Sequence, residues 1–203
     1  MPCLRCKRGA RGTEPGVCPL ASATVLGKEY IRRFDRAAEE LADRARKISG
    51  ADRLFYTASA FGDFGLMWVI FALLRALRGG RDNERAAIRG IVATGIESFL
   101  VNVLLKSVFR RKRPIEQVDH PLPLRQPLTS SFPSGHATAA FCGAVILSDN
   151  DVLAPLYFGA AAVISASRVY VKIHHASDVA GGIVVGVALG TIARRLFPLH
   201  RAK

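Results

Sequence analysis

Hydrophobic residues gather in five long blocks in the part of the chain that follows residue 58. The blocks cover residues 59–77, 88–109, 135–147, 152–171 and 179–197. A helix that crosses a membrane needs about 20 mainly apolar residues, and four of the five blocks are close to that length. The shortest of the polar breaks between them favour antiparallel neighbouring helices. The pattern therefore predicts an all-α integral membrane bundle of about five transmembrane helices.

The stretch before these blocks, residues 28–48, has a different pattern. Its apolar residues recur at steps of three and four, with charged residues between them: Ile31, Phe34, Ala38, Leu41, Ala45 and Ile48. This spacing places them on one face of an amphipathic helix. Because the apolar face is modest and the rest is heavily charged, we expect this helix to lie on the membrane or to dock on the bundle.

Glycines and prolines break any regular pattern before residue 28, which indicates a flexible tail. The predicted organisation is a basic tail over 1–27, an interfacial helix and linker over 28–58, a transmembrane domain over 59–197 and a short basic tail over 198–203.

Composition supports a membrane protein over a soluble one. The chain is 50% hydrophobic, yet its formal net charge is +13, and its mean hydropathy is +0.21. Basic flanks around apolar spans combine these values readily. Apolar residues in long blocks do not suit a nucleic-acid-binding domain, so we expect the lipid bilayer and no nucleic acid as a partner. Gly182, Gly186 and Gly190, four residues apart, predict that another helix approaches the fifth block closely.

The cysteines do not indicate a metal centre. Cys3 and Cys6 have the spacing of a zinc-binding pair, but no second pair or histidine lies at the distance of a zinc finger. Cys142 falls in an apolar block and is interpreted as a packing residue. We therefore predict no metal and no cofactor.

Three groups of reactive residues lie at the ends of the blocks. Successive spans alternate in direction, so the end of the second block, the start of the third, the end of the fourth and the start of the fifth meet on one side. All three groups fall at these ends. The alternation predicts one shared site.

The first group lies at the end of the second block, where Lys106 and Arg113 are seven residues apart. Seven helical residues return a side chain to nearly the same face, so the two cations can clamp one anion. Pro114 then ends the helix. Lys106 lies inside the apolar block, where a charge needs a partner. The cations at 110–112 are interpreted as an ordinary positive membrane flank.

The second group, residues 131–137, begins the third block. Pro133 and Ser134 suit the start of a helix, and Gly135 lets the backbone come close to a ligand. The free amides of a helix start attract phosphate oxygens. His136 lies in the first turn, where it could give a proton to a leaving group.

The third group, residues 167–178, links the last two blocks. If the residues after Ile173 are helical, His174 and Asp178 are four apart and share a face. A carboxylate there can hold one ring nitrogen of the histidine and leave the other free as a nucleophile. Arg168 could reach the same point and bind an anion.

Together the groups provide cations, helix-start amides, two histidines and one carboxylate, with no acidic cluster suited to magnesium or calcium. A phosphoryl group can be transferred without a metal when arginine and lysine neutralise its oxygens and a histidine attacks in line. This inventory fits such a reaction.

The three groups resemble the signature of the type 2 phosphatidic acid phosphatase family, written Lys-x6-Arg-Pro, Pro-Ser-Gly-His and Ser-Arg-x5-His-x3-Asp. All three patterns occur without a mismatch, in the family's order, between residues 106 and 178. The resemblance implies an integral membrane lipid phosphatase that works without a metal or other cofactor.

The resemblance also implies roles for the matching residues. His174 would be the nucleophile that forms a phosphohistidine, Asp178 would orient it, and His136 would protonate the leaving group. The implied phosphate ligands are Lys106, Arg113, Ser134, Gly135 and Arg168. His175 matches no position of the signature, and neither does Glu97, which lies deep in the second block.

The substrate stays open at this point. The resemblance fits polyprenyl phosphates or diphosphates, and equally glycerolipid phosphates such as phosphatidate. Vanadium haloperoxidases are similar at the same motifs, with vanadate in place of phosphate. Their resemblance is to large soluble proteins, and the five apolar blocks argue against this alternative. A lipid-phosphate-binding protein without turnover is a further alternative, against which the intact histidines weigh, because a binder needs only the cations.

The expected location is the cell membrane, and its sidedness stays open. Arginines at the opposite end of the predicted bundle favour that end as cytoplasmic, and the resemblance likewise favours a site outside the cytoplasm. Five spans, however, place the basic N-terminal tail on the side of the site, and such tails usually stay inside.

Overall fold

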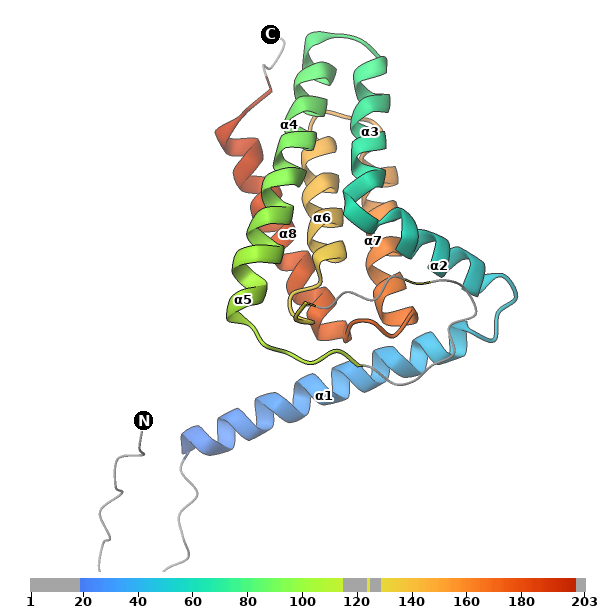
Figure 1. Cartoon of the computed structure of the whole chain (residues 1–203), viewed down its shortest axis with the longest axis vertical. Helices are drawn as coiled ribbons and strands as arrows, with labels where there is room; N and C mark the ends of the chain where they lie inside the picture. The colour runs from blue at the N-terminus through green and yellow to red at the C-terminus, as the bar shows by residue number, and fades with distance from the viewer. Residues whose placement is uncertain (1–18, 115–123, 125–128, 200–203) are drawn as a thin grey trace, which may run out of the picture.

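The computed structural model describes residues 19–114, 124 and 129–199, and every regular element in this part of the chain is helical. The elements are α1 (Pro19–Ala45), α2 (Ala51–Phe61), the 3₁₀ turn η1 (Asp63–Gly65), α3 (Leu66–Leu77), α4 (Arg81–Phe99), the π-helical η2 (Leu100–Leu105), α5 (Lys106–Val108), α6 (Gly135–Leu147), α7 (Ala154–Tyr170) and α8 (Ala176–Leu196). Helices α3, α4, α6, α7 and α8 form an upright bundle, and α1 lies across one of its ends (Figure 1).

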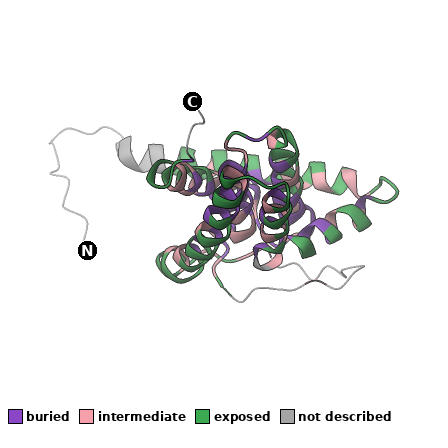
Figure 2. Ribbon diagram, turned by 90° about the horizontal axis from the view of Figure 1, so that it is seen from above, coloured by how far each residue is buried: buried purple, intermediate pink, exposed green. Residues whose placement is uncertain are grey.

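The all-helical prediction is confirmed, and the membrane character is evident in two continuous helices. The segments Arg81–Val108 and Ala176–Leu196 are long and apolar enough to cross a membrane. Helices α2 and α3 make a third candidate if the bent pair counts as one span, and α6 is apolar but shorter. Viewed from above, buried residues gather between the helices and exposed residues face outward (Figure 2). Many of those outward residues are large and apolar, which suits a lipid-facing surface.

The first apolar block differs from its predicted form as a single helix over 59–77. The helix begins earlier, at Ala51, and the chain turns by 75° between Phe61 and Leu66. Gly65 adopts the left-handed backbone conformation at φ +69°, which an α-helix cannot continue. Gly62 allows close packing, because a Cβ atom there would lie 2.8 Å from Cδ2 of His136. The bend places Asp63 beside the start of α6.

Helix α6 is central, and α8 packs against it closely. A Cβ atom on Gly186 would lie 2.4 Å from the carbonyl oxygen of Thr138, and one on Gly182 would lie 2.6 Å from that of Ser134. The close approach predicted from the glycine spacing is therefore confirmed. Cys142 is a buried free thiol in this interface, in agreement with its interpretation as a packing residue.

Ion pairs fasten the end of the bundle that lies away from α1. Arg75, only 1% exposed, pairs with Asp151 at 3.2 Å in the loop between α6 and α7. Asp149 in the same loop binds Arg89 at 2.8 Å and Arg194 at 2.6 Å. Burial alone would raise the pKa of Asp151, but the amide of Leu153 and the neighbouring arginines hold it below its usual value.

Helix α1 begins at Pro19 and ends at Ala45, whereas the sequence pattern predicted 28–48. Proline is well suited to the first turn of a helix, which explains a start inside the predicted tail. Gly50, at φ +84°, follows the helix end. The remainder of that predicted tail, residues 1–18, and residues 200–203 lie outside the described residues.

Helix α4 continues into α5 through a π-helical stretch. The amide of Lys106 donates to the carbonyl of Val101, five residues back. Single π-turns inside longer helices occur frequently at functional sites. Here the stretch ends at the first cation of the candidate site.

Candidate active site

The three groups predicted from the sequence meet at one end of the bundle, beside α1. The end of α5, the start of α6, the end of α7 and the start of α8 all lie there (Figure 1). A backbone hydrogen bond of 3.1 Å from Ser134 to the carbonyl of Asp178 joins the starts of α6 and α8. The predicted convergence of chain ends is therefore confirmed.

His174 lies in the loop between α7 and α8 and is buried. Its Nε2 atom is 3.0 Å from Nη1 of Arg113. An arginine nitrogen can only donate, so Nε2 carries the lone pair and Nδ1 carries the proton. The ring therefore presents a nucleophilic nitrogen to the predicted anion clamp.

The protonation of His174 follows from its surroundings. Burial lowers its pKa to about 3; Asp178 opposes this shift, and the charges of Arg168 and Arg113 add to it. The ring is consequently neutral at physiological pH. Only a neutral imidazole can attack phosphorus.

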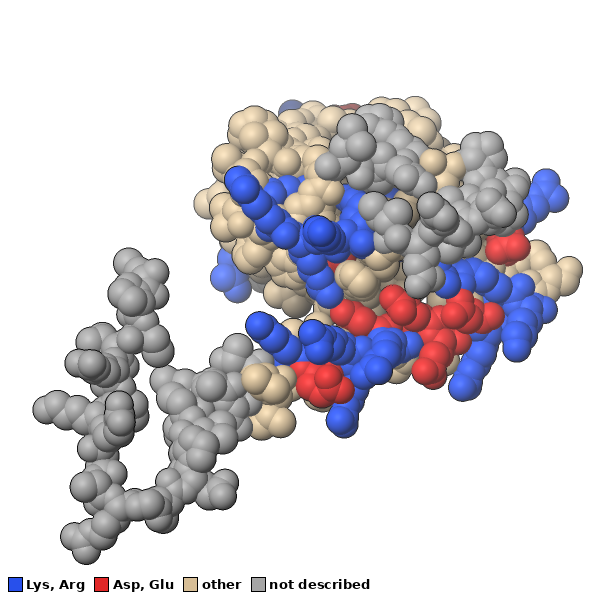
Figure 3. All heavy atoms as spheres, turned by 60° about the horizontal axis from the view of Figure 1, so that its bottom comes forward, with Lys and Arg blue, Asp and Glu red and all other residues tan. Residues whose placement is uncertain are grey.

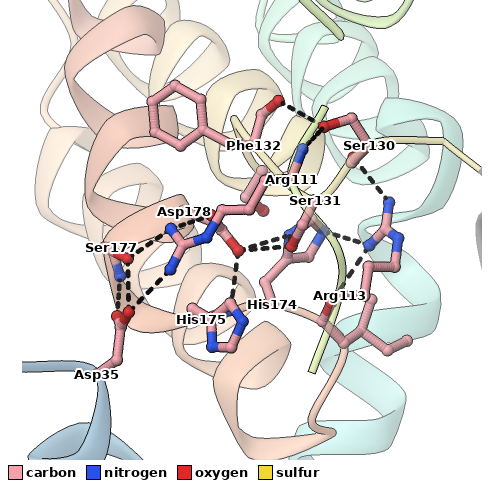
Figure 4. A network of polar contacts seen from close by, with 12 residues as sticks. Asp35, Arg111, Arg113, Ser130, Ser131, Phe132, His174, His175, Ser177 and Asp178 are labelled. Atoms are coloured by element: carbon pink, nitrogen blue, oxygen red, sulfur yellow. Dashed lines mark hydrogen bonds and ion pairs between the residues drawn. The ribbon is translucent and has the colours of Figure 1, made fainter. Parts of the chain in front are cut away.

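Asp178 is fully buried at the start of α8, but its contact with His174 is indirect. Its Oδ2 atom is 3.8 Å from Nδ1 of the histidine, which is too long for a hydrogen bond. The hydroxyl of Ser131 donates to the same carboxylate oxygen at 2.5 Å and lies 3.4 Å from Nδ1 (Figure 4). Ser131 thus bridges the predicted pair.

Arg111 corrects the interpretation of residues 110–112 as a simple membrane flank. Its Nη1 atom donates to Oδ1 of Asp178 at 2.7 Å, and its Nη2 atom donates to Asp35 of α1 at 3.0 Å (Figure 4). The sequence could not reveal this role, because Arg110 and Lys112 beside it are equally basic and are exposed. The folded position of Arg111, between α1 and α8, separates it from its neighbours.

Unpaired donors mark the place where an anion would bind. Arg168 is 1% exposed and donates through Nη1 to Ser59. Among the described residues, its Nε and Nη2 atoms have no hydrogen-bond partner, and neither does the buried hydroxyl of Ser134. Buried guanidinium and hydroxyl donors are costly to leave unpaired, so this arrangement is suited to a ligand with several acceptor oxygens.

Lys106 and Gly135 complete this part of the site. The Lys106 ammonium donates to Asn102 at 2.7 Å and to Thr129 at 3.3 Å. It also lies 3.4 Å from where a Cβ atom of Gly135 would be. Ser134 makes no side-chain cap at the start of α6, so the first amides of that helix stay available to an anion.

His136, the predicted acid, has a partner that the sequence did not reveal. Its Nε2 atom lies 3.0 Å from Oδ1 of Asp63, in the bend between α2 and α3. The distance between the two residues in the sequence hides this pair, and only the bend between Phe61 and Leu66 brings them together. His175 caps the start of α8, and its Nδ1 atom is 3.7 Å from Glu39 of α1, in agreement with its exclusion from the motif.

The arrangement can carry out phosphoryl transfer. It combines a neutral histidine nucleophile, a second histidine held by a carboxylate, and cationic donors for phosphate oxygens. Among residues 19–114, 124 and 129–199, the histidine, cysteine and acidic side chains form no group of three that could hold a metal ion.

Comparison with known proteins agrees with this chemistry. The chain is 32% identical to the decaprenylphosphoryl-5-phosphoribose phosphatase of Mycobacterium tuberculosis over 155 residues, which is 75% of this chain and 81% of that protein. It is 34% identical to the protein of the same name from Mycolicibacterium smegmatis over 146 residues, 70% of this chain and 74% of that one.

Two solved structures share the fold. The crystal structure of LpxE from Aquifex aeolicus matches with a TM-score of 0.60 and 30% identity over 77% of this chain and 92% of that one. That of the transmembrane PAP2-type phosphatidylglycerolphosphate phosphatase from Bacillus subtilis matches with a TM-score of 0.65 and 23% identity over 91% of this chain and 94% of that one. The PAP2 superfamily model matches residues 86–202, more than half of the chain, and the chain therefore belongs to this family.

Proposed function

We propose that this protein is an integral membrane phosphatase that hydrolyses a phosphate ester or diphosphate on a membrane lipid through a phosphohistidine at His174. The unpaired, buried donors of Arg168 beside the neutral histidine are the observation that carries the proposal. These donors would also serve a lipid-phosphate binder, and the buried histidine beside them, with its lone pair on Nε2, favours turnover. The identity to two decaprenylphosphoryl-5-phosphoribose phosphatases favours a polyprenyl lipid over a glycerolipid such as phosphatidate.

The chemistry takes two steps. First, Nε2 of His174 forms a bond to phosphorus, the bond from phosphorus to the lipid oxygen breaks, and His136 gives that oxygen its proton. Second, a water molecule attacks the phosphohistidine while the now neutral His136 accepts a proton from the water. The N–P bond breaks, inorganic phosphate leaves, and the histidine regains its lone pair.

The cations and Asp178 stabilise this sequence in different ways. In the free protein Arg113 donates to Nε2, and on substrate binding its donors turn to the phosphate oxygens, which frees the nucleophile. Arg168 and Lys106 neutralise the charge that builds on those oxygens. Asp178, acting through the hydroxyl of Ser131, stabilises the positive charge that develops on the ring.

An apolar cavity of about 720 Å³ between α4 and α8 is suited to the lipid tail. Its walls include Ile88, Val92, Ala93, Ile96, Leu189 and Ile192. It reaches Leu100 on the helix that continues to Lys106. Glu97, buried at 2% exposure, also lines it, so the carboxyl of this residue lies between tail and headgroup.

Five crossings fit the arrangement of the chain, with α2 and α3 counted as one. Helix α1 lies at the catalytic end and the last residues of α8 lie at the opposite end, as an odd number of crossings requires (Figure 1). Helix α6, with 13 residues, spans only about 20 Å. The hydrocarbon core of a bilayer is about 30 Å thick, so the first turn of α6, with His136, would lie below the membrane surface, where a lipid headgroup would have to reach it.

Helix α1 would lie in the interface beside the site. Tyr30, Phe34 and Leu41 form an exposed apolar stripe on one side of it. Asp35, Glu39 and Asp43 face the bundle. A helix with one side on protein and an apolar stripe beside it is suited to the membrane surface. The arginines at the opposite end favour that end as cytoplasmic and the site as external, in the cell membrane.

The test is phosphate release by the purified protein in detergent with EDTA present. Wild type should release inorganic phosphate from a polyprenyl phosphate faster than from phosphatidate, and His174→Ala should release none. With radiolabelled substrate and an alkaline quench, the wild-type chain should retain acid-labile phosphate. Loss of wild-type activity on chelation would contradict the metal-free mechanism. Full activity of His174→Ala would show that His174 is not the nucleophile.

A further inference from the structure

We propose that Asp35 and Arg111 are positioning residues that hold the catalytic pair through an ion-pair bridge from α1. The proposal rests on the proposed phosphatase function. Neither residue belongs to the three motifs, and the two are 76 positions apart in the chain. Figure 4 shows them side by side at the start of α8.

The bridge begins at Asp35, which is only 7% exposed although α1 lies on the outside of the bundle. Its Oδ1 atom accepts the backbone amide of Ser177 at 2.8 Å, and its Oδ2 atom accepts the hydroxyl of the same serine at 2.9 Å. Nη2 of Arg111 donates to Oδ2 at 3.0 Å. This carboxylate therefore fixes both the first turn of α8 and the guanidinium beside it.

Arg111 continues the bridge to the catalytic carboxylate in two ways. Its Nη1 atom donates to Oδ1 of Asp178 at 2.7 Å and to the hydroxyl of Ser177 at 2.8 Å. Its carbonyl accepts the amide of Ser131 at 2.9 Å, and its own amide donates to Ser130 at 3.1 Å. One residue thus holds both Asp178 and the serine that bridges it to His174.

The contacts of Asp178 show why this matters. Its Oδ2 atom is occupied by the hydroxyl of Ser131 at 2.5 Å and the amide of His175 at 3.0 Å. Its Oδ1 atom is held by Arg111. The carboxylate stays 3.8 Å from Nδ1 of His174, so its orientation and its single serine bridge decide how the ring is held. Without Arg111, the carboxylate of Asp178 loses its partner at Oδ1, and Ser131 loses the side chain that keeps the neighbouring chain segment in place.

Helix α1 is placed for this task by a row of acidic residues. Asp35, Glu39 and Asp43 follow at steps of four, and each contacts the catalytic end: Arg111 and Ser177, then His175 at 3.7 Å, then Lys172 at 3.5 Å. Figure 3, which looks at this end, shows acidic side chains gathered between the basic side chains of the body and those of α1. Among the described residues, Asp35 is the one of the three that hydrogen-bonds to Arg111 and Ser177, whereas Glu39 approaches only the ring of His175, at 3.7 Å.

The test measures inorganic phosphate release from a polyprenyl phosphate in detergent. It compares Arg111→Gln and Asp35→Asn with the matched controls Arg110→Gln, Lys112→Gln and Glu39→Gln. Because the phosphate-binding cations remain, we expect KM to change less than about threefold while kcat falls about 100-fold for Arg111→Gln. Asp35→Asn should fall about tenfold, and Arg111→Lys should recover part of the loss. The double variant should be no slower than Arg111→Gln alone, because both act through one bridge.

The outcomes separate this role from the function on which it rests. An inactive wild type would overturn the proposed phosphatase and the bridge with it. An active wild type, with Arg111→Gln as fast as Arg110→Gln, would overturn only the bridge. The positioning role would also be wrong if Asp35→Asn lowered the melting temperature but left kcat unchanged at temperatures below it. It would be wrong as well if Asp35→Asn and Arg111→Gln multiplied their effects on kcat in the double variant.

Discussion

Gly182→Ala tests whether the close contact between α6 and α8 holds the catalytic site in place. The new Cβ atom would lie 2.6 Å from the carbonyl oxygen of Ser134, whereas ordinary contact begins at 3.4 Å. The carbonyl cannot move freely, because it accepts the amide of Thr138 at 3.0 Å and the hydroxyl of the same residue at 2.9 Å. The start of α6 must therefore move by the missing 0.8 Å and carry His136 with it.

The magnitude follows for stability and for rate. Overpacking of this kind costs about 1–3 kcal/mol, and each kcal/mol lowers the melting temperature of a chain this size by roughly 2–4 °C. A displacement near 1 Å of a catalytic group can cost about 100-fold in rate. Gly182→Ala should thus lose some stability and about two orders of magnitude in kcat.

Gly95→Ala in α4 is the matched control, because nothing lies within 4 Å of its would-be Cβ atom. Alanine is favoured over glycine in a helix by about 1 kcal/mol, so this variant should be no less stable than wild type. The assay is thermal unfolding followed by circular dichroism, with phosphate release measured well below the transition. A Gly182→Ala protein as stable and as fast as Gly95→Ala would refute the reasoning.

Three further perturbations have defined outcomes. Because burial lowers the pKa of His174 to about 3 from its usual 6.5, the ring stays neutral and kcat/KM should not fall between about pH 8 and pH 5 through this group. Acidification between pH 6.5 and about 3 protonates His174 in the unfolded chain but not in the folded protein, so the stability that the neutral ring contributes above pH 6.5 is lost as pH falls toward 3. The melting temperature of wild type should therefore drop more on acidification than that of His174→Asn. Asp151→Asn leaves Arg75 buried without its ion pair, and should cost about 3–5 kcal/mol in unfolding experiments while the folded fraction keeps its kcat; an unchanged melting temperature would show that the pair contributes nothing. Ala93→Trp fills the cavity between α4 and α8, and displacing two methylenes of lipid tail should raise KM for a polyprenyl phosphate about tenfold; an equal rise for a short-chain phosphate would place the tail elsewhere.

The residues of the three motifs could be placed from the sequence because each lies at the end of an apolar block. Chain direction alternates from block to block, so Lys106, Ser134 and His174 had to come to one side whatever the details of packing. The extent of α6 was predicted without error, since Gly135 and Leu147 are flanked by strong turn signals.

The supporting residues could not be predicted, because their roles depend on contacts between distant segments. Asp63 reaches His136 only through the bend between Phe61 and Leu66, and periodicity alone favoured a straight helix there. From their sequence neighbours, Ser131 would be interpreted as an ordinary loop serine and Arg111 as part of a basic flank. Ser131 meets Asp178 only when the starts of α6 and α8 pack together, and Arg111 meets Asp35 only when α1 docks, which no spacing in the sequence encodes.

The π-helical stretch Leu100–Leu105 has a consequence for chain length. A π-turn takes up one residue more than an α-turn, so the segment holds a spare residue without rotating the side chains on either side of it. Deleting one residue inside it, such as Val103, should restore a regular helix and leave Lys106 facing Gly135. The same deletion at Ala93 would rotate Lys106 by about 100° relative to the start of α4. A one-residue deletion is therefore tolerated within Leu100–Leu105 and not in the rest of this span, because the distance from α4 to Lys106 sets the direction of a phosphate-binding side chain.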